Sequence, residues 1–327
     1  MLTVTLYTRE GCSLSDQAAQ DLEELQDEIP HQLVLIDVEK EEISDLLEKI
    51  PVVEVGPYTI SAPFDKKKLR ITLGAARDRQ GQIGQVAQAS QKKRIQRGKR
   101  LTAADRLFYW LSRRYMLVFN SLAFIYVGLA FLAPVLLANG NKLASNIIYT
   151  VYGRLCHQLS YRSWFLFGEQ PAYPRSAANV QGLEPYETAT GMDPQDLGLA
   201  ISFRGNDILG YKVAFCQRDI AIYSAILLFG LIFSLTKRKI PPLPLLAWIL
   251  LGLLPIGLDG LSQMISQLPW DLFPVRESTP LLRTITGALF GFSTAWFGYP
   301  IVEQSMAETR KVLAVKIKAA RLDADQV

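Results

Sequence analysis

Hydrophobic positions change their pattern once along this 327-residue chain, near residue 116. Before that point short apolar runs alternate with charged residues, and after it four segments are almost free of charge: 117–138, 220–235, 243–258 and 281–302. A helix needs about 20 apolar residues to cross about 30 Å of hydrocarbon. We therefore expect a soluble head followed by an all-α bundle of about four transmembrane helices.

The head shows the periods of both strands and helices. Alternation predicts strands at 2–7 and 31–36 and a hairpin of 52–55 with 58–60, whereas helical spacing covers 14–26, 41–49 and 65–73. This order, strand–helix–strand and then strand–strand–helix, predicts a thioredoxin-type α/β fold. We divide the chain into the head, a basic polar linker, the transmembrane domain and a basic tail, at 1–76, 77–105, 106–305 and 306–327.

Clusters of basic residues flank the apolar segments at the ends that a four-span topology places on one side of the membrane. They precede the first span, follow the second at 236–239 and follow the fourth from Arg310 onward. Because positively charged flanks stay in the cytoplasm, we expect both termini there, loops 139–218 and 259–280 on the other side, and a multi-pass protein of the plasma (inner) membrane. The first residues lack a basic n-region, so we expect no signal peptide.

The charge balance argues against nucleic acid as a partner. The formal net charge is only +4, and the basic run at 92–100 is explained by membrane orientation and attraction to lipid headgroups. No aromatic residue that could stack on a base lies between Arg77 and Arg106.

Cys12 lies where the first strand turns into the first helix. A thiol there faces the unpaired N–H groups of the helix, which favour the thiolate. The run Leu6-Tyr7-Thr8-Arg9-Glu10-Gly11-Cys12-Ser13-Leu14-Ser15 resembles the start of small glutaredoxin-like proteins, and Ile50-Pro51-Val52 resembles their cis-proline site. The resemblance implies a thiol site of Cys12, Ser15 and Pro51, with Pro51 in a cis peptide bond.

Ser15 stands where dithiol members of that family carry a second cysteine. A monothiol route through a mixed disulfide with a small thiol, such as glutathione or an equivalent, then remains. The alternative is a degenerate fold that is kept as a docking or sensing module.

A second group of residues with possible chemistry lies on the far side of the membrane. Cys156, His157, Cys216 and Asp219 supply two sulfurs, an imidazole and a carboxylate, which suits tetrahedral zinc. A disulfide between Cys156 and Cys216 and two unpaired thiols are the competing interpretations.

Polar residues also occur at membrane depth. Asp259 and Gln263 are one helical turn apart, and Arg283 belongs to the next helix, with Arg276-Glu277 shortly before it. Such groups usually face a partner inside the bundle. We expect a polar cluster that could bind an anionic or zwitterionic ligand, against the alternatives of a helix end at Asp259-Gly260 and a rim ion pair of Arg276 with Glu277.

The membrane part resembles a family of predicted membrane proteins, domain of unknown function 2085, over about 150–300. The resemblance rests on Cys156-His157-Gln158, Arg162-Ser163, Cys216-x-Arg218, Asp259-Gly260-x-x-Gln263, Arg276-Glu277-Ser278, Leu282-Arg283 and Thr286-Gly287. The family pattern implies a zinc-like Cys-His and Cys-x-x-Cys quartet, in which Asp219 replaces the last cysteine.

Two classes of function follow. The first is thiol-redox or metal handling through Cys12 and the Cys156/His157/Cys216/Asp219 group. The second is binding or transport by the Asp259, Gln263, Arg276, Glu277 and Arg283 cluster, with the head as a regulatory or docking module. Expected partners are the lipid bilayer and an unknown small ligand or thiol. Four spans are few for a stand-alone channel, which is compatible with a homodimer.

Overall fold

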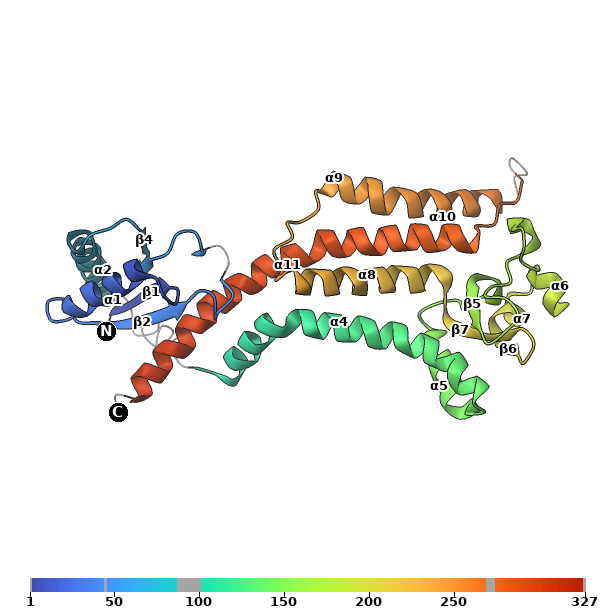
Figure 1. The fold of residues 1–327 in the computed structure, drawn as a ribbon, viewed down its shortest axis with the longest axis horizontal. Helices are drawn as coiled ribbons and strands as arrows, with labels where there is room; N and C mark the ends of the chain where they lie inside the picture. The colour runs from blue at the N-terminus through green and yellow to red at the C-terminus, as the bar shows by residue number, and fades with distance from the viewer. Residues whose placement is uncertain (1, 44–45, 87–100, 269–273, 326–327) are drawn as a thin grey trace. The chain divides into compact units, whose positions relative to one another are not determined.

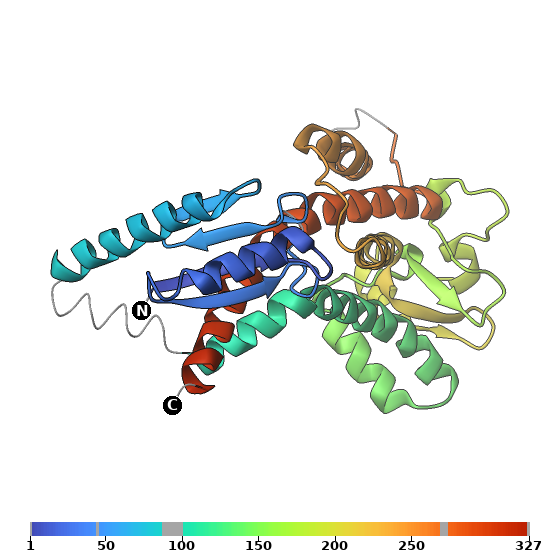
Figure 2. The ribbon, with the colours of Figure 1, turned by 60° about the vertical axis from the view of Figure 1, so that its left-hand side comes forward.

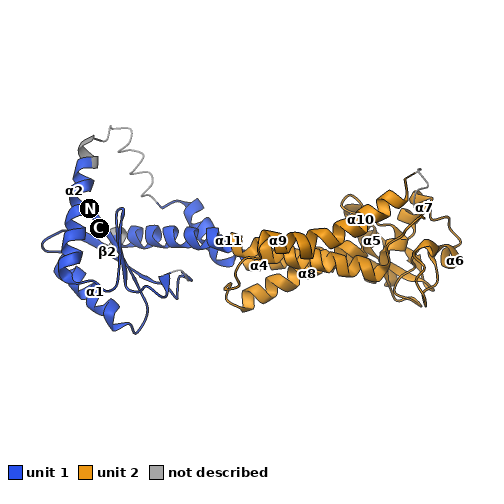
Figure 3. Cartoon of the chain, turned by 90° about the horizontal axis from the view of Figure 1, so that it is seen from above, with its two compact units in different colours: residues 1–115, 303–327 blue, residues 116–302 orange. Residues whose placement is uncertain are grey.

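The computed structural model describes residues 2–43, 46–86, 101–268 and 274–325 and divides into two compact units. Unit 1 comprises Met1–Tyr115 and Glu303–Val327, and unit 2 comprises Met116–Val302 (Figure 3). Two helices, α4 (Ala103–Ala138) and α11 (Pro280–Asp325), contribute residues to both.

Unit 1 contains a four-stranded sheet of order β2-β1-β3-β4. The strands β1 (Leu2–Thr8) and β2 (His31–Asp37) are parallel, and β3 (Val52–Val55) runs antiparallel to β1 and to β4 (Tyr58–Ser61). Helices α1 (Ser13–Glu24) and α2 (Lys66–Val86) share a core with the sheet, to which Leu22 and Leu69 contribute. This is a thioredoxin-like head, as the sequence predicts.

The helix expected at 41–49 is wrong for the residues that the structure describes there. They form turns and a short 3-10 stretch, and residues 44–45 lie outside the described range. The Asp37 carboxylate accepts hydrogen bonds from the amides of Glu39 (3.0 Å) and Lys40 (3.1 Å). Glu42 adopts a left-handed φ of 56°. Such side-chain turns and left-handed residues interrupt a helix.

The last part of α11 packs against the core on the β2 side of the head. Ala314 is buried in one cluster with Val34, Ile36 and Val52. Lys311 Nζ lies 2.8 Å from a carboxylate oxygen of Glu54 on β3. The described part of the expected separate tail, 306–325, therefore continues α11 and belongs to the compact unit of the head, because the apolar surface of the sheet requires a cover.

Arg310 is the most completely buried of the charged groups in this contact. Its guanidinium donates to the backbone carbonyls of Ser112 (2.8 Å) and Glu42 (3.2 Å) and pairs with Glu303. Its side chain is 0% exposed, so the partners of the guanidinium are these protein groups and not water. Arg310 thus ties α11, α4 and the segment after β2 together within unit 1.

The linker expected at 77–105 is only partly described. Residues 77–86 continue α2, and α4 begins at Ala103. The basic run at 92–100 lies outside the described residues.

Unit 2 contains the membrane bundle. Four helical stretches among the described residues are long and apolar enough to cross a membrane: Ala103–Ala138, Gln217–Leu235, Leu245–Ser266 and Pro280–Leu322. The third consists of α9 (Leu245–Trp248), a π-helical turn η4 (Ile249–Leu253) and α10 (Leu254–Ser266). The expected number of spans is confirmed. The second and third helices are longer than their charge-free segments, so Asp259-Gly260 lies inside α10 and does not end a helix.

Small residues bring α8 (Gln217–Leu235) and α11 close together. A Cβ on Gly291 would lie 2.1 Å from the carbonyl oxygen of Ile222, and one on Gly287 would lie 2.7 Å from that of Arg218. Only glycine permits this approach, which is typical of helix packing in membranes. The contact aligns the first turns of both helices, where Arg218 and Arg283 are located.

A folded lobe occupies one end of the bundle (Figures 1 and 2). It contains α5 (Lys142–Tyr152), α6 (Tyr186–Thr190), α7 (Leu197–Ser202) and the 3-10 turns η2 (Ser160–Arg162) and η3 (Ser176–Ala178). Its sheet has the order β5-β7-β6, from β5 (Ser163–Leu166), β6 (Gly205–Asn206) and β7 (Gly210–Cys216). The expected loop 139–218 is therefore a structured element that ends directly at α8.

Candidate functional site

Cys12 occupies the N-cap position of α1 and is half-buried. Ser15, one turn later, is buried. Apart from its interaction with Cys12, its hydroxyl makes no hydrogen bond among the described residues. The hydroxyl and the backbone amide of Ser15 stabilise the thiolate, and they hold the pKa of Cys12 below its ordinary value. The serine that replaces the second cysteine thus favours the reactive form of the first.

Pro51 lies at the same edge of the sheet as the thiol turn. Its peptide bond with Ile50 is cis, as the glutaredoxin-like resemblance predicts. The register pairs Tyr7 near the end of β1 with Val52 at the start of β3. Pro51 therefore precedes β3 at the edge where β1 ends and the chain proceeds to Cys12 and Ser15. The expected thiol site of these three residues is consistent with this topology.

Cys156 and Cys216 are brought together in the lobe from distant parts of the chain. Cys216 is the N-cap of α8, and its sulfur accepts a hydrogen bond from the amide of Asp219 (3.4 Å). The Cys156 amide donates to the carbonyl of Tyr152 at the end of α5 (2.9 Å). The two Sγ atoms and a carboxylate oxygen of Asp219 all lie within 4.8 Å of one another.

Gln158 fixes the position of Cys156. Its side-chain amide donates to the carbonyls of Tyr149 in α5 (3.0 Å) and Ala214 in β7 (2.9 Å). Both bonds are buried, so the chain after α5 is held against the strand that leads to Cys216. A left-handed φ of 52° at Gln158 permits this turn.

The structure separates the four expected metal ligands into three and one. Cys156, Cys216 and Asp219 form the compact group, and His157 does not belong to it. All four line a cavity of about 280 Å³, whose other polar walls include Arg162, Arg218, Gln263 and Arg283. The cavity therefore joins the thiol group to the polar cluster of the bundle.

The two thiols have opposite acidities. A hydrogen bond with Cys216 lowers the pKa of Cys156, and the same bond together with burial raises the pKa of Cys216. Cys156 is thus the more acidic thiol of the pair and Cys216 the less acidic one. All three cysteines lie in the described part of the chain and are unpaired.

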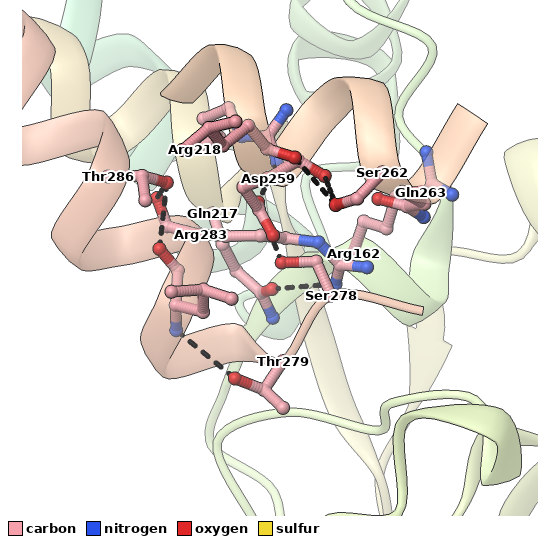
Figure 4. A network of polar contacts seen from close by, with 12 residues as sticks. Arg162, Gln217, Arg218, Asp259, Ser262, Gln263, Ser278, Thr279, Arg283 and Thr286 are labelled. Atoms are coloured by element: carbon pink, nitrogen blue, oxygen red, sulfur yellow. Dashed lines mark hydrogen bonds and ion pairs between the residues drawn. The ribbon is translucent and has the colours of Figure 1, made fainter. Parts of the chain in front are cut away.

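Asp259 on α10 is the first centre of the polar cluster (Figure 4). It is 4% exposed and pairs with Arg218 of α8 and with Arg276 (2.9 Å), and it accepts a hydrogen bond from Ser278 (2.8 Å). Arg276 also reaches the Ser262 hydroxyl at 2.7 Å. This carboxylate holds α8, α10 and the segment before α11 together.

Glu277 is the second centre and is completely buried. Its carboxylate receives Arg162 Nε at 3.0 Å, Gln263 Nε2 at 2.7 Å, Arg175 at 3.5 Å, and Arg283. Arg283 also donates to Gln217 (3.3 Å), whose amide donates to the carbonyl of Ser163 (3.0 Å). Arg276 and Glu277 therefore bind separate partners, and the rim ion pair between them that the sequence suggested as an alternative is wrong.

Sequence reasoning found all five residues of the expected cluster but missed three partners of their side chains. Gln217 and Ser262 stand at unspecified positions of the quoted motifs, and Arg175 lies in the lobe without any pattern around it. Only the fold places Arg175 beside Glu277.

Comparisons with known proteins agree with the division of the chain into a head and a membrane domain. Residues 3–74 match the model of the glutaredoxin-like domain DUF836, and residues 202–297 match that of the predicted membrane protein family DUF2085. The chain carries a glutaredoxin-like head and a DUF2085 membrane domain. The second match contains Cys216, Asp219, Asp259, Glu277 and Arg283, while Cys156 and His157 lie outside it.

The uncharacterized protein MJ1492 of Methanocaldococcus jannaschii is similar to this chain. It is 26% identical over 201 residues, which cover 58% of this chain and 94% of the relative. The combined findings show a membrane protein with a redox-like head.

Proposed function

We propose that this protein handles thiols or a thiophilic metal ion, with zinc as the expected ion, at the group formed by Cys156, Cys216 and Asp219. The convergence of two sulfurs and one carboxylate oxygen within 4.8 Å is the observation that supports this function. Thiolates and carboxylates are ordinary zinc ligands, and three protein ligands with one open position are typical of catalytic zinc sites.

The residues present fit a zinc ion by their chemistry. Cys156 is predisposed to ionise, because its pKa is lowered, and a bound metal would deprotonate Cys216 as well. His157 lines the same cavity and is the expected fourth ligand only after a rearrangement of its side chain. When bound, zinc would supply a Lewis acid, and the protein's own residues would hold it and shield it from bulk water.

The head has a separate proposed role. Cys12 attacks a mixed disulfide between a small thiol, such as glutathione, and a second, different thiol: Cys12 takes over the small thiol as a mixed disulfide, and the second thiol leaves as the thiolate. A further molecule of the small thiol then attacks this mixed disulfide, which releases the Cys12 thiolate and forms the disulfide of the small thiol. The basic flanks support a cytoplasmic head, cytoplasmic termini and a lobe on the far side of a plasma (inner) membrane. A homodimer remains compatible with four spans.

The alternative function, ligand binding by Asp259, Gln263, Arg276, Glu277 and Arg283, has less support. Both carboxylates already accept several hydrogen bonds and ion pairs from residues of the protein. Such a network fixes helices relative to one another, and we assign a positioning role to its two carboxylates, those of Asp259 and Glu277.

Elemental mass spectrometry of the detergent-purified full chain tests the metal site. We expect about one zinc per chain, lost in Cys156→Ser and Cys216→Ser and retained in Cys12→Ser, which removes a thiol from the head. No metal, together with a reducible bond between Cys156 and Cys216, would overturn the metal proposal in favour of a disulfide. Unbonded thiols without metal would overturn it as well.

A further inference from the structure

The cavity beside the thiol group carries a surplus of positive charge. Five guanidinium groups, those of Arg162, Arg175, Arg218, Arg276 and Arg283, are ion-paired with only two carboxylates, those of Asp259 and Glu277. Among the described residues of this network, three positive charges therefore have no carboxylate of their own. Arg283 is 3% exposed and the other four side chains are 18–38% exposed, so a nearby counter-charge would stabilise this partly buried group of positive charges.

Three of these arginines face the cavity. Arg162, Arg218 and Arg283 line it together with Cys156, Cys216 and Asp219. The Nε of Arg218 is buried and has no hydrogen-bond partner among the described residues, although the other end of the guanidinium pairs with Asp259. Asp259 thus takes up only part of the donor capacity of the Arg218 guanidinium, whose side chain is 24% exposed.

Asp219 is the one carboxylate among the described residues that line this cavity. Counted with Asp259 and Glu277, it gives three carboxylates for five guanidinium groups, so two positive charges remain without a carboxylate.

We infer that this cavity is a binding site for a small oxyanion, a carboxylate or a phosphate group, held by Arg162, Arg218 and Arg283. Guanidinium groups bind such groups through paired N–H donors in a planar fork. A volume of about 280 Å³ accommodates a small molecule and places its anionic group beside the Cys156 and Cys216 sulfurs. The site shares its cavity with the proposed thiol or metal function but does not require a metal.

Isothermal titration calorimetry of the full-length protein in neutral detergent tests this site, with inorganic phosphate and acetate as the titrated probes. We expect saturable binding of at least one probe both in zinc-loaded protein and after chelation. Arg218→Gln should weaken it about tenfold or more, because a charged hydrogen-bond donor is lost. Arg218→Lys, which keeps the charge, should recover part of the affinity.

Arg175→Gln is the matched control. It removes one guanidinium from the same network, but Arg175 is not among the described residues that line the cavity. We expect its affinity for the probe to stay within about twofold of wild type. Absence of saturable binding for both probes, or an equal loss in Arg175→Gln and Arg218→Gln, would overturn the inference.

The same titration distinguishes a free anion from a lipid headgroup. In bilayers of phosphatidylglycerol, a headgroup in the cavity would compete with phosphate, whereas bilayers of phosphatidylcholine would leave phosphate binding unchanged. Zinc content is measured on each variant, so a failed metal proposal and a failed anion site give separate results.

Discussion

The sulfur of Cys156, after α5, lies within 4.8 Å of the sulfur of Cys216, at the start of α8. One hydrogen bond between them divides the pair into a thiol of lowered pKa and a thiol of raised pKa. This relationship governs both their reactivity and their suitability as metal ligands.

The first prediction concerns selective alkylation of metal-free protein. Cys156 should react faster than Cys216 at neutral pH, because a thiol of lowered pKa is ionised at lower pH. Its rate should rise with pH with a midpoint below the ordinary thiol pKa of 9.0. Cys216→Ala removes the hydrogen bond and should shift this midpoint to higher pH. Mass spectrometry of the labelled peptides measures the rates, and faster labelling of Cys216 would contradict the assignment.

The second prediction concerns the head. Ser15→Ala should raise the pKa of Cys12 and slow its alkylation at pH 7 by about threefold or more, the change in rate that corresponds to the loss of one stabilising hydrogen bond to the thiolate. Ser13→Ala is the control, because Ser13 is exposed and does not contribute to the lowered pKa. Equal rates in wild type and Ser15→Ala would show that the serine does not activate the thiol.

The third prediction concerns the contribution of α11 to unit 1. Ala314→Glu places a charge in the apolar cluster of Val34, Ile36 and Val52 and should destabilise the head by about 3 kcal/mol or more. Val312, 65% exposed on the same helix, gives the control Val312→Glu, which should change stability by less than about 0.5 kcal/mol. The measurement is chemical denaturation, in which hydrogen exchange of the β1 and β2 peptides reports the unfolding of the head. Unchanged protection in Ala314→Glu would refute a shared core.

The fourth prediction concerns the buried carboxylate of Glu277. Glu277→Gln leaves the guanidiniums of Arg162 and Arg283 without their counter-charge and should cost about 3–5 kcal/mol of stability. Arg175→Gln should cost much less, because Arg175 is partly exposed and lies at 3.5 Å. Thermal unfolding in detergent compares the two. Similar losses for both variants would mean that the network is not centred on Glu277.

Local sequence patterns sufficed for much of the fold. Alternation in 2–7 and the run around Cys12 indicated the thioredoxin-like head, and charge-free segments indicated the spans. The helix expected at 41–49 failed because local turn bonds at Asp37 and a left-handed Glu42 outweighed its apolar spacing. No pattern within that segment reveals these bonds.

The sequence by itself determined which residue types were available: thiols and carboxylates near α8, and arginines flanking Asp259 and Glu277. It also determined the spans, because a helix that crosses the hydrocarbon must be predominantly apolar over about 20 residues. Only the tertiary structure decided that His157 is separate from the three-residue group, that Arg175 reaches Glu277, and that α11 contributes Ala314 and Arg310 to unit 1. These outcomes depend on distances between segments far apart in the chain, which side-chain packing and buried charge pairing establish.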